Sequence, residues 1–382
     1  MDVLYRCCAG LDVHKKTVVV CVRRVGPDGQ VHTQVRTFAT TTNGLLELAD
    51  WLIAAGVTHV AMESTGVYWK PVFNILEGQV EVMLVNAHHI KNVPGRKTDV
   101  KDAEWIAQLL AHGLLKPSLI PPPPIRDLRD LTRQRTLLVR ERATVANRIQ
   151  KVLEVANIKL ASVASDPLGV SGRAMIRGLI AGERDPVVLA ELSRKALRRK
   201  IPQLREALHG RVTDHHRFLL RMLMGQVEYL EAQVAEFDHR IGEMTTPFAE
   251  AEARLRTIPG VGAQAAEVIV AETGADMSRF PTAGHLASWA GLCPGNDQSA
   301  GKRRSGKTTK GSQWLRTVLV QVGWAAVHSK ATIFGVTYRG YAKRMGKKKA
   351  LVAIAHKILT IIHKLLKDGT DYVERLAPPQ AA

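Results

Sequence analysis

The opening segment of the chain decides the fold. Residues 5–39 read YRCCAGLDVHKKTVVVCVRRVGPDGQVHTQVRTFA. Two apolar, β-branched runs, 5–14 and 17–24, are short enough to be adjacent strands. The turn residues Gly26 to Gln30 (GPDGQ) predict a hairpin into a third run, VHTQVRTFA. We therefore expect three antiparallel strands at the start of an α/β domain.

Helices and strands alternate after this hairpin. NGLLELADWLIAAG has helical apolar spacing from a cap at Asn43, and GVYWKPVFNILEG predicts a second, short helix. VTHVAME and VEVMLVNA predict further strands. Three antiparallel strands followed by this alternation indicate a ribonuclease-H-like order. The rigid run Pro121 to Pro124 ends this α/β domain, which we assign to residues 1–120.

The charge of the chain is strongly positive and unevenly distributed. Its 382 residues hold 54 Lys+Arg and 35 Asp+Glu, a net charge of +19. Residues 1–120 are close to neutral, whereas the interval between Asp297 and Asp368 holds 16 basic residues and no acidic one. This balance indicates a polyanionic partner, most simply nucleic acid. Aromatic residues make up only 5% of the chain, which disfavours an RNA-recognition surface of stacked rings.

The composition also predicts the compartment. The longest apolar runs fall short of the roughly 20 residues that cross a bilayer, and the N-terminus lacks a signal-peptide pattern. The four cysteines show no CxxC spacing, so neither a disulfide framework nor a zinc ribbon is indicated. We expect a cytoplasmic protein without a membrane partner.

The middle of the chain, residues 121–254, is predicted to be helical. An apolar seam with spacings of three and four runs from Leu220 to Met244, and a second one repeats every seven residues from Leu131 to Val152. Such coiled-coil-like helices can pair within the chain or between subunits, and both alternatives are open. The segment 162–212, rich in Gly, Pro and basic residues, is predicted to be irregular.

The last domain, residues 255–382, is predicted to be mainly α-helical and to end in a buried helix. The segment IPGVGAQAA has the form of a helix-hairpin-helix turn. Gly260 and Gly262 would let the backbone approach phosphates, and the following helix N-terminus would add amide dipoles. An ordinary αα-hairpin is the alternative interpretation.

Acidic residues stand at the ends of the predicted strands. Asp12 follows the first strand, Glu63 ends the strand VTHVAME, and Asp99 and Asp102 share one face of a helix entered near Thr98. Carboxylates gathered at one sheet edge repel one another unless divalent cations compensate them. Mg²⁺, or Mn²⁺, bound there could activate oxygens in phosphoryl transfer. Singly, each acid could instead be a cap or turn residue.

A long basic insertion, GLCPGNDQSAGKRRSGKTTKGSQWLR, separates two apolar helices. Ser299 could be a nucleophile on phosphorus, and Lys302 with its neighbours could hold the non-bridging oxygens. A nucleic-acid-binding loop without covalent chemistry is the alternative. Our candidate nucleic-acid-binding residues are Gly260, Gly262, Lys302, Arg303, Arg304, Lys307 and Lys310.

Taken together, these segments resemble the DEDD insertion-sequence transposases. The matching motifs are GLDVHKKTVVV, AMESTGVYW, VPGRKTDVKDAEWIAQLL, TIPGVGAQAA and the basic serine segment. The resemblance implies a RuvC-like N-terminal domain with catalytic, metal-binding Asp12, Glu63, Asp99 and Asp102, and a serine-bearing C-terminal domain. The family's Ser-Ser-Gly-Gly-Lys-like segment reads QSAGK here, which assigns the serine to Ser299 and leaves Ser305 as the alternative.

The resemblance also implies partners. In this family the acidic site and the serine come from different subunits, so a homodimer or homotetramer is expected. A structured guide RNA from the element's noncoding ends would pair with target and donor DNA. We therefore expect a bacterial, nucleoid-associated recombinase that mobilises its own insertion sequence. A metal-dependent Holliday-junction-type nuclease and a non-catalytic nucleic-acid scaffold are the competing functions.

Overall fold

The computed structural model describes residues 3–64, 66–86, 102–295, 297–299, 302–305, 307–329 and 332–374. The chain divides into two compact units, Met1–Pro121 and Pro122–Ala382. Within the described ranges, we find no helix that combines the length and the apolar character needed to span a membrane.

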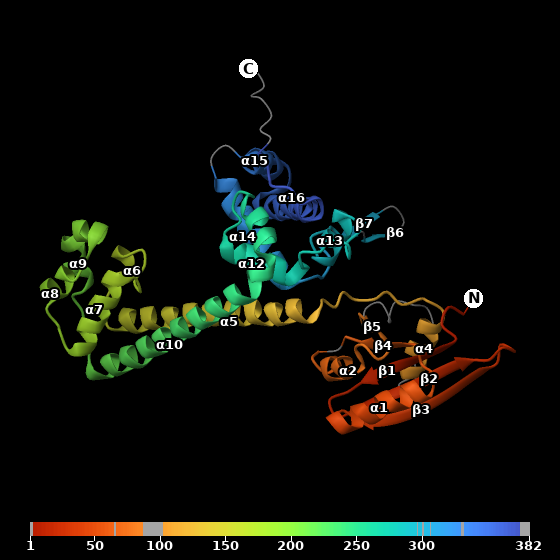
Figure 1. Cartoon of the computed structure of the whole chain (residues 1–382). Helices are drawn as coiled ribbons and strands as arrows, with labels where there is room; N and C mark the ends of the chain where they lie inside the picture. The colour runs from red at the N-terminus through yellow and green to blue at the C-terminus, as the bar shows by residue number, and fades with distance from the viewer. Residues whose placement is uncertain are drawn as a thin grey trace, which may run out of the picture. The chain divides into compact units, whose positions relative to one another are not determined.

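The first unit is a mixed five-stranded sheet with helices (Figure 1). The strand order is β3-β2-β1-β4-β5; β1, β2 and β3 are antiparallel, and β4 and β5 run parallel to β1. The three antiparallel strands and the alternation that follows them agree with the sequence prediction. The elements are β1 (Cys7–Val13), β2 (Thr17–Val25), β3 (Val31–Ala39), α1 (Thr42–Ala54), β4 (His59–Glu63), α2 (Trp69–Leu76), β5 (Glu81–Val85) and α4 (Asp102–Ala111).

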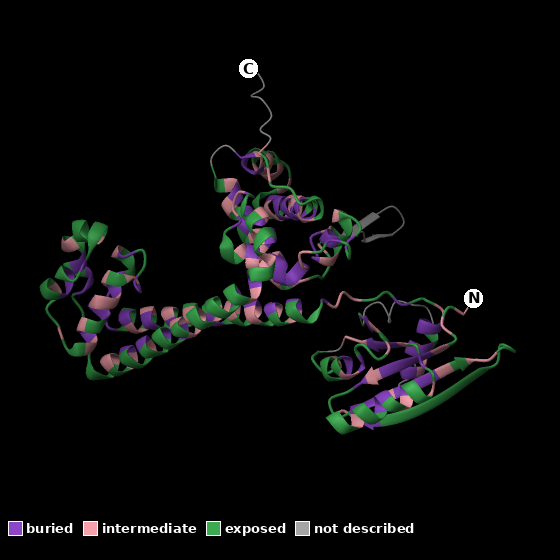
Figure 2. Cartoon of the chain, in the orientation of Figure 1, coloured by how far each residue is buried: buried purple, intermediate pink, exposed green. Residues whose placement is uncertain are grey.

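The central strands are buried and the β3 edge is exposed (Figure 2). Every β3 residue except Phe38 is exposed. On one face of the sheet, α1 and α2 pack over the apolar side chains of β1, β2 and β4. On the other face, α4 covers Cys8, Ala61 and Val85. The sheet therefore lies between two helical layers, and α4 alone forms one of them among the described residues.

Over its described residues, the second unit is helical apart from one hairpin. Its helices are α5 (Pro123–Val155), α6 (Leu160–Val163), α7 (Val170–Ala181), α8 (Pro186–Glu191), α9 (Ile201–Ala207), α10 (Asp214–Thr245), α11 (Ala249–Arg256), α12 (Ala263–Thr273), α13 (Ala283–Trp289), α14 (Gln313–His328), α15 (Ile333–Met345) and α16 (Lys347–Asp368). The hairpin consists of β6 (Asp297–Ser299) and β7 (Lys302–Ser305).

Helices α5 and α10 form a long antiparallel pair within the chain. Arg135 pairs with Asp238 and Arg142 pairs with Glu231, so residue numbers fall along one helix as they rise along the other. The predicted seams supply much of this contact, because Leu138, Val145, Leu220, Val227 and Leu230 are buried in one shared core. The structure thus shows the in-chain pairing, in which Leu230 is only 4% exposed.

The prediction that residues 162–212 are irregular is wrong. This segment forms α7, α8, a 3₁₀ helix (Lys195–Lys200) and α9, which pack into the same core as the end of α5. Each helix is short, and Asp185 with Pro186 starts α8 by a side-chain cap and a proline at the first helical position. Helices this short carry little apolar periodicity, so caps and tertiary contacts define them.

The predicted buried helix near the C-terminus is present. Helix α16 buries eight residues along its length, among them Ile354, Ile358 and His363. The His363 imidazole Nε2 lies 2.7 Å from the carbonyl oxygen of Phe280, which joins α16 to the segment before α13. The proposed division of this unit at residue 255 remains a prediction.

Candidate active site

Asp12 and Glu63 occupy neighbouring positions on adjacent parallel strands. The register of β1 and β4 pairs Leu11 with Met62, and the next residues along both strands are Asp12 and Glu63. Neighbouring strands lie about 4.8 Å apart, so the two backbones are close at this edge of the sheet. The alternation of a strand puts Asp12 on the same side as Gly10, and Glu63 on the same side as Ala61.

That side is the one covered by α4. A Cβ placed on Gly10 would lie 2.2 Å from the carbonyl oxygen of Ala103 and 2.3 Å from the amide nitrogen of Ala107. Ala61 belongs to the core cluster formed with α4. The absence of a side chain at Gly10 thus lets the α4 backbone rest directly on β1, and both acidic residues project to the face where α4 lies.

Helix α4 runs antiparallel to β1, with its first residue towards Asp12. Its last residue, Ala111, accepts hydrogen bonds from the amides of Leu4 and Tyr5 before β1 begins. The Cys8 thiol lies 3.6 Å from the carbonyl oxygen of Ala107 one turn earlier in α4. Following this order along both elements, the start of α4 at Asp102 lies beside the end of β1. Two strand ends and one helix start therefore converge on one edge of the sheet.

One further side chain, His14, borders this edge. The His14 imidazole Nε2 lies 3.1 Å from a carboxylate oxygen of Asp12, an interaction that the sequence analysis missed although both residues fall on one face of the chain two positions apart. Glu104 interacts electrostatically with β2. Burial and the Glu104 charge together raise the pKa of the Cys21 thiol on that strand to about 11.

The residue types at this edge suit a hard divalent cation, since carboxylate oxygens are the ligands that Mg²⁺ and Mn²⁺ prefer. Asp99, the fourth predicted ligand, lies outside the described residues. Within the described ranges, no group of three His, Cys, Asp or Glu side chains stands close enough to hold a metal ion. Among the described residues, Asp12, Glu63 and Asp102 remain predicted ligands.

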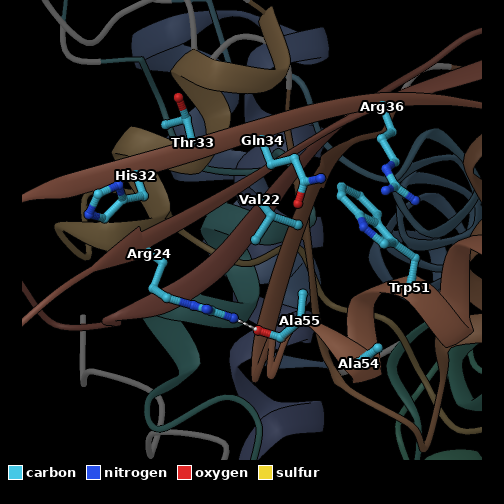
Figure 3. A pocket seen from close by; sticks show the side chains of 9 residues that line it. All are labelled: Val22, Arg24, His32, Thr33, Gln34, Arg36, Trp51, Ala54 and Ala55. Carbon is cyan, nitrogen blue, oxygen red and sulfur yellow. Dashed lines mark hydrogen bonds between the residues drawn. The ribbon is translucent and has the colours of Figure 1, made fainter.

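A surface pocket of about 310 Å³ lies towards the other end of the sheet (Figure 3). Arg24, which lines it, pairs with Cys7 at the start of β1, whereas Asp12 pairs with Val19 near the strand's end. In the pocket, the Arg24 side chain donates to the carbonyl oxygen of Ala55. This pocket is therefore separate from the acidic edge.

The predicted serine loop is a two-stranded hairpin. Ser299 pairs with Lys302 and Gln298 pairs with Arg303, on either side of the turn. The register shifts next to Asp297, which pairs with Ser305 and leaves Arg304 as the extra residue of a bulge. Lys307 and Lys310 follow β7 as exposed residues of the irregular segment before α14.

The base of the hairpin is fixed by two glycines. Gly291 has a φ of +67°, and a Cβ there would lie 2.7 Å from the amide nitrogen of Gly311. A Cβ on Gly311 would in turn lie 2.5 Å from the carbonyl oxygen of Trp289. The two ends of the loop thus meet backbone against backbone, which sets where the hairpin leaves the helical frame.

A buried ion pair holds the end of this loop. Ser312 caps α14, its hydroxyl accepting from the amide of Leu315 and donating to the Glu272 carboxylate at 2.8 Å. Glu272 is 0% exposed and accepts two hydrogen bonds from the Arg133 guanidinium, at 2.7 and 3.0 Å. The pair joins α5, α12 and the start of α14. Sequence reasoning missed it because its two charges are 139 residues apart.

The two glycines of the IPGVGAQAA segment have different surroundings. Gly260 has a φ of +89°, and a Cβ there would lie 2.6 Å from the carbonyl oxygen of Val322 in α14. Its need for glycine is thus explained by helix packing. A Cβ on Gly262, which caps α12, would meet no atom within 4 Å. Only Gly262 presents the open backbone that phosphate contact requires.

Comparison with known proteins identifies the chain. Residues 9–158 match the DEDD-type IS110 family described as "Transposase", and residues 252–338 match the family described as "Transposase IS116/IS110/IS902 family". The chain belongs to the IS116/IS110/IS902 transposase family. It is therefore a DNA transposase or recombinase, and DEDD-type transposase nuclease domains generally use divalent metals.

Individual relatives agree with this assignment. A Sinorhizobium fredii protein named as a transposase, y4rJ, is 29% identical over 72% of this chain and 67% of its own length. Another transposase of that organism, y4pF/y4sB, is 28% identical over 72% of this chain and 64% of its own length. An IS110 insertion-element protein of Streptomyces coelicolor is 32% identical over 32% of this chain and 30% of its own. The pilin gene-inverting protein of Moraxella bovis is 28% identical over 39% of this chain and 48% of its own.

Proposed function

We propose that this transposase moves its own insertion sequence by metal-assisted, serine-dependent strand exchange. The observation that carries the proposal is the convergence of Asp12, Glu63 and the start of α4 on one edge of the mixed five-stranded sheet. Asp12, Glu63, Asp99 and Asp102 would hold Mg²⁺ or Mn²⁺. The cation would lower the barrier by stabilising negative charge on the reacting phosphate oxygens.

Ser299 would form the covalent bond to DNA. Its hydroxyl oxygen attacks a backbone phosphorus, the bond from phosphorus to the leaving strand's oxygen breaks, and that oxygen takes up a proton while the serine proton is released. The result is a phosphoserine link and a free strand end. Lys302, which pairs with Ser299 in the hairpin, and its neighbours Arg303 and Arg304 supply positive charge for the non-bridging oxygens.

The reaction is proposed to take place on bacterial DNA in the cytoplasm, at the nucleoid. Donor and target DNA would be paired to a structured guide RNA, and a dimer or tetramer would join the acidic edge of one subunit to the serine of another. The resemblance to DEDD insertion-sequence transposases supports the guide RNA and the shared site. The strongly positive second unit supports the nucleic-acid partners.

Strand cleavage with single-carboxylate variants tests the metal part of this proposal. Asp12→Asn and Asp102→Asn should each lower Mg²⁺-dependent cleavage by at least about a hundredfold, since loss of a ligand exceeds the usual effect of losing a supporting group. Glu104→Gln is the matched control, because it removes a carboxylate from the same first turn of α4. If Asp12→Asn cuts as fast as Glu104→Gln, the acidic edge is not the metal site.

A further inference from the structure

The second unit contains a groove that the reaction described above does not use. It has a volume of about 610 Å³ and lies between α5, the start of α12 and one side of α14. Its walls combine arginines, a tryptophan, valines and neutral polar side chains, and its lining contains no acidic residue among the described ones. The lining residues on which the argument rests are Arg133, Arg140, Val139, Gly262, Val268 and Trp314.

Trp314 is held between two cations on α5. The guanidinium carbon of Arg133 lies 5.7 Å from the indole centroid, and that of Arg140 lies 5.3 Å from it. Seven residues separate the two arginines, about 10.5 Å along a helix, so both side chains reach the same indole from different turns of α5. Both distances fall within the range of a cation–π attraction.

The two arginines differ in how firmly they are held. Arg133 is bound to the buried Glu272 by two hydrogen bonds and cannot leave the indole without breaking that pair. Arg140 is exposed, and in the part of the chain that the structure describes its guanidinium has no carboxylate partner. Of the two cations near the indole, Arg133 is therefore fixed and Arg140 is displaceable.

We propose that this groove binds an unpaired base of single-stranded nucleic acid together with its phosphate. The base stacks on Trp314 between the apolar walls of Val139 and Val268, and Arg140 turns from the indole to the neighbouring phosphate. Gly262 brings no side chain to cap α12, so the first amides of that helix can support the same phosphate. Bases within a duplex are stacked on each other and cannot enter in this way.

The groove also lies beside the base of the serine hairpin. Trp314 stands two residues after Ser312, whose hydroxyl holds the base of the serine hairpin to Glu272. A strand separated during exchange could be held there while Ser299 reacts. The inference rests on the proposed function only in requiring that the chain handles opened strands, and it concerns binding, which can be measured without cleavage.

The test measures binding of labelled oligonucleotides to the full chain by fluorescence anisotropy in EDTA. Trp314→Leu should weaken binding of a single-stranded 20-mer about tenfold, in keeping with the loss of one stacked base, and Arg140→Gln severalfold. Two variants serve as matched controls. Trp324→Leu removes a 60% exposed tryptophan of the same helix outside the groove, and Arg148→Gln removes an exposed arginine of α5 beyond it. Both should stay within about twofold of wild type.

Three further measurements distinguish stacking of an unpaired base from other modes of binding. Binding to a blunt duplex should change less than twofold in Trp314→Leu, and Trp314→Phe should restore most single-strand affinity. Irradiation of 5-iodouracil-containing strands should cross-link Trp314 itself, which also decides the case if Trp314→Leu does not fold. DNA and RNA versions of the strand tell which nucleic acid is held.

Equal single-strand binding by Trp314→Leu and Trp324→Leu would overturn the proposal. So would an equal loss for duplex and single strand, or competition by poly-glutamate as strong as that by the oligonucleotide, since the groove would then be a site for charge alone. Asp12→Asn should bind strands normally and fail to cut them. The experiments therefore show separately whether the proposal for the groove or the proposal for the acidic edge is wrong.

Discussion

The acidic edge and the serine hairpin are built in different ways. Asp12 and Glu63 are positioned by the register of two buried parallel strands, and Asp102 by a helix whose backbone rests on Gly10. The serine hairpin leaves the helical frame through a contact between Gly291 and Gly311 and is held by the buried Glu272. The acidic edge is part of the core of the first unit, while the serine hairpin is attached to the helical core of the second. Substitutions near the two regions should therefore differ in how much stability they remove.

The largest effect is expected at Gly10. Gly10→Val places a branched side chain where even a single Cβ would overlap the α4 backbone. We expect the first unit to lose more than about 5 kcal/mol of unfolding free energy, enough to unfold a domain of ordinary stability. Thermal melting with limited proteolysis near Pro121 assigns the loss to that unit. Gly10→Ala should lie between wild type and Gly10→Val, and a wild-type melting temperature for it would refute the close helix–strand contact.

The next effect concerns Glu272. Glu272→Gln removes the buried negative charge that pairs with the half-buried Arg133 and, at 3.8 Å, with the more deeply buried Arg129, and we expect a loss of about 3–5 kcal/mol. Glu250→Gln is the control, because Glu250 is 88% exposed in its ion pair with Arg254 and should change stability by less than about 0.5 kcal/mol. Denaturant melts of both variants give the comparison. Equal losses would mean that the buried pair does not support the hairpin's base.

The sequence predicted the acidic edge better than the hairpin region, and the reason is physical. Strands have a period of two and end at recognisable turns, so Asp12 and Glu63 could be placed at strand ends from local pattern alone. Gly10 gave no such signal, because its role depends on a helix more than ninety residues later. Glu272 and Arg133 likewise meet only through the packing of α5 against α12.

Other features of the helical unit were not predicted from the sequence, for the same reason. The segment 162–212 was mistaken for irregular chain because short helices with single caps carry little periodicity. The seams of α5 and α10 were recognised, but their partner could not be read from a pattern that suits in-chain and intersubunit pairing equally. Trp314 could have been noticed as an aromatic residue directly after a basic loop, although its arginine partners are distant in sequence.

A smaller effect separates the two glycines of the helical turn. Gly260→Ala combines a positive φ with overlap against the Val322 carbonyl, and we expect a loss of about 1–3 kcal/mol. Gly262→Ala meets no neighbouring atom and should lose about 1 kcal/mol or less. Thermal melts of the two variants test this difference. If Gly262→Ala lost more stability than Gly260→Ala, helix packing would not explain Gly260, and it would again be a candidate phosphate-binding position.

The smallest effect is a pH dependence at the joint of α10, α11 and α12. Burial and the nearby Glu267 carboxylate raise the pKa of Glu252 from 4.5 to about 7. A raised pKa of an acid means that the folded state prefers the protonated form. Its stabilising contribution is full below about pH 4.5 and is lost as the pH rises through about 7. Between pH 5 and pH 8, wild type should therefore lose more melting temperature than Glu252→Gln, and parallel curves would contradict the raised pKa.

The central claim is that the serine hairpin performs chemistry which the acidic edge alone does not. The most direct measurement is to incubate the full chain with Mg²⁺, guide RNA and labelled DNA, and to map covalent adducts by denaturing gel and peptide mass analysis. We predict a DNA adduct on Ser299 that is retained in Ser305→Ala and absent in Ser299→Ala, with DNA affinity nearly unchanged in both. Full recombination by Ser299→Ala would contradict the account and make a metal-dependent junction nuclease the better description.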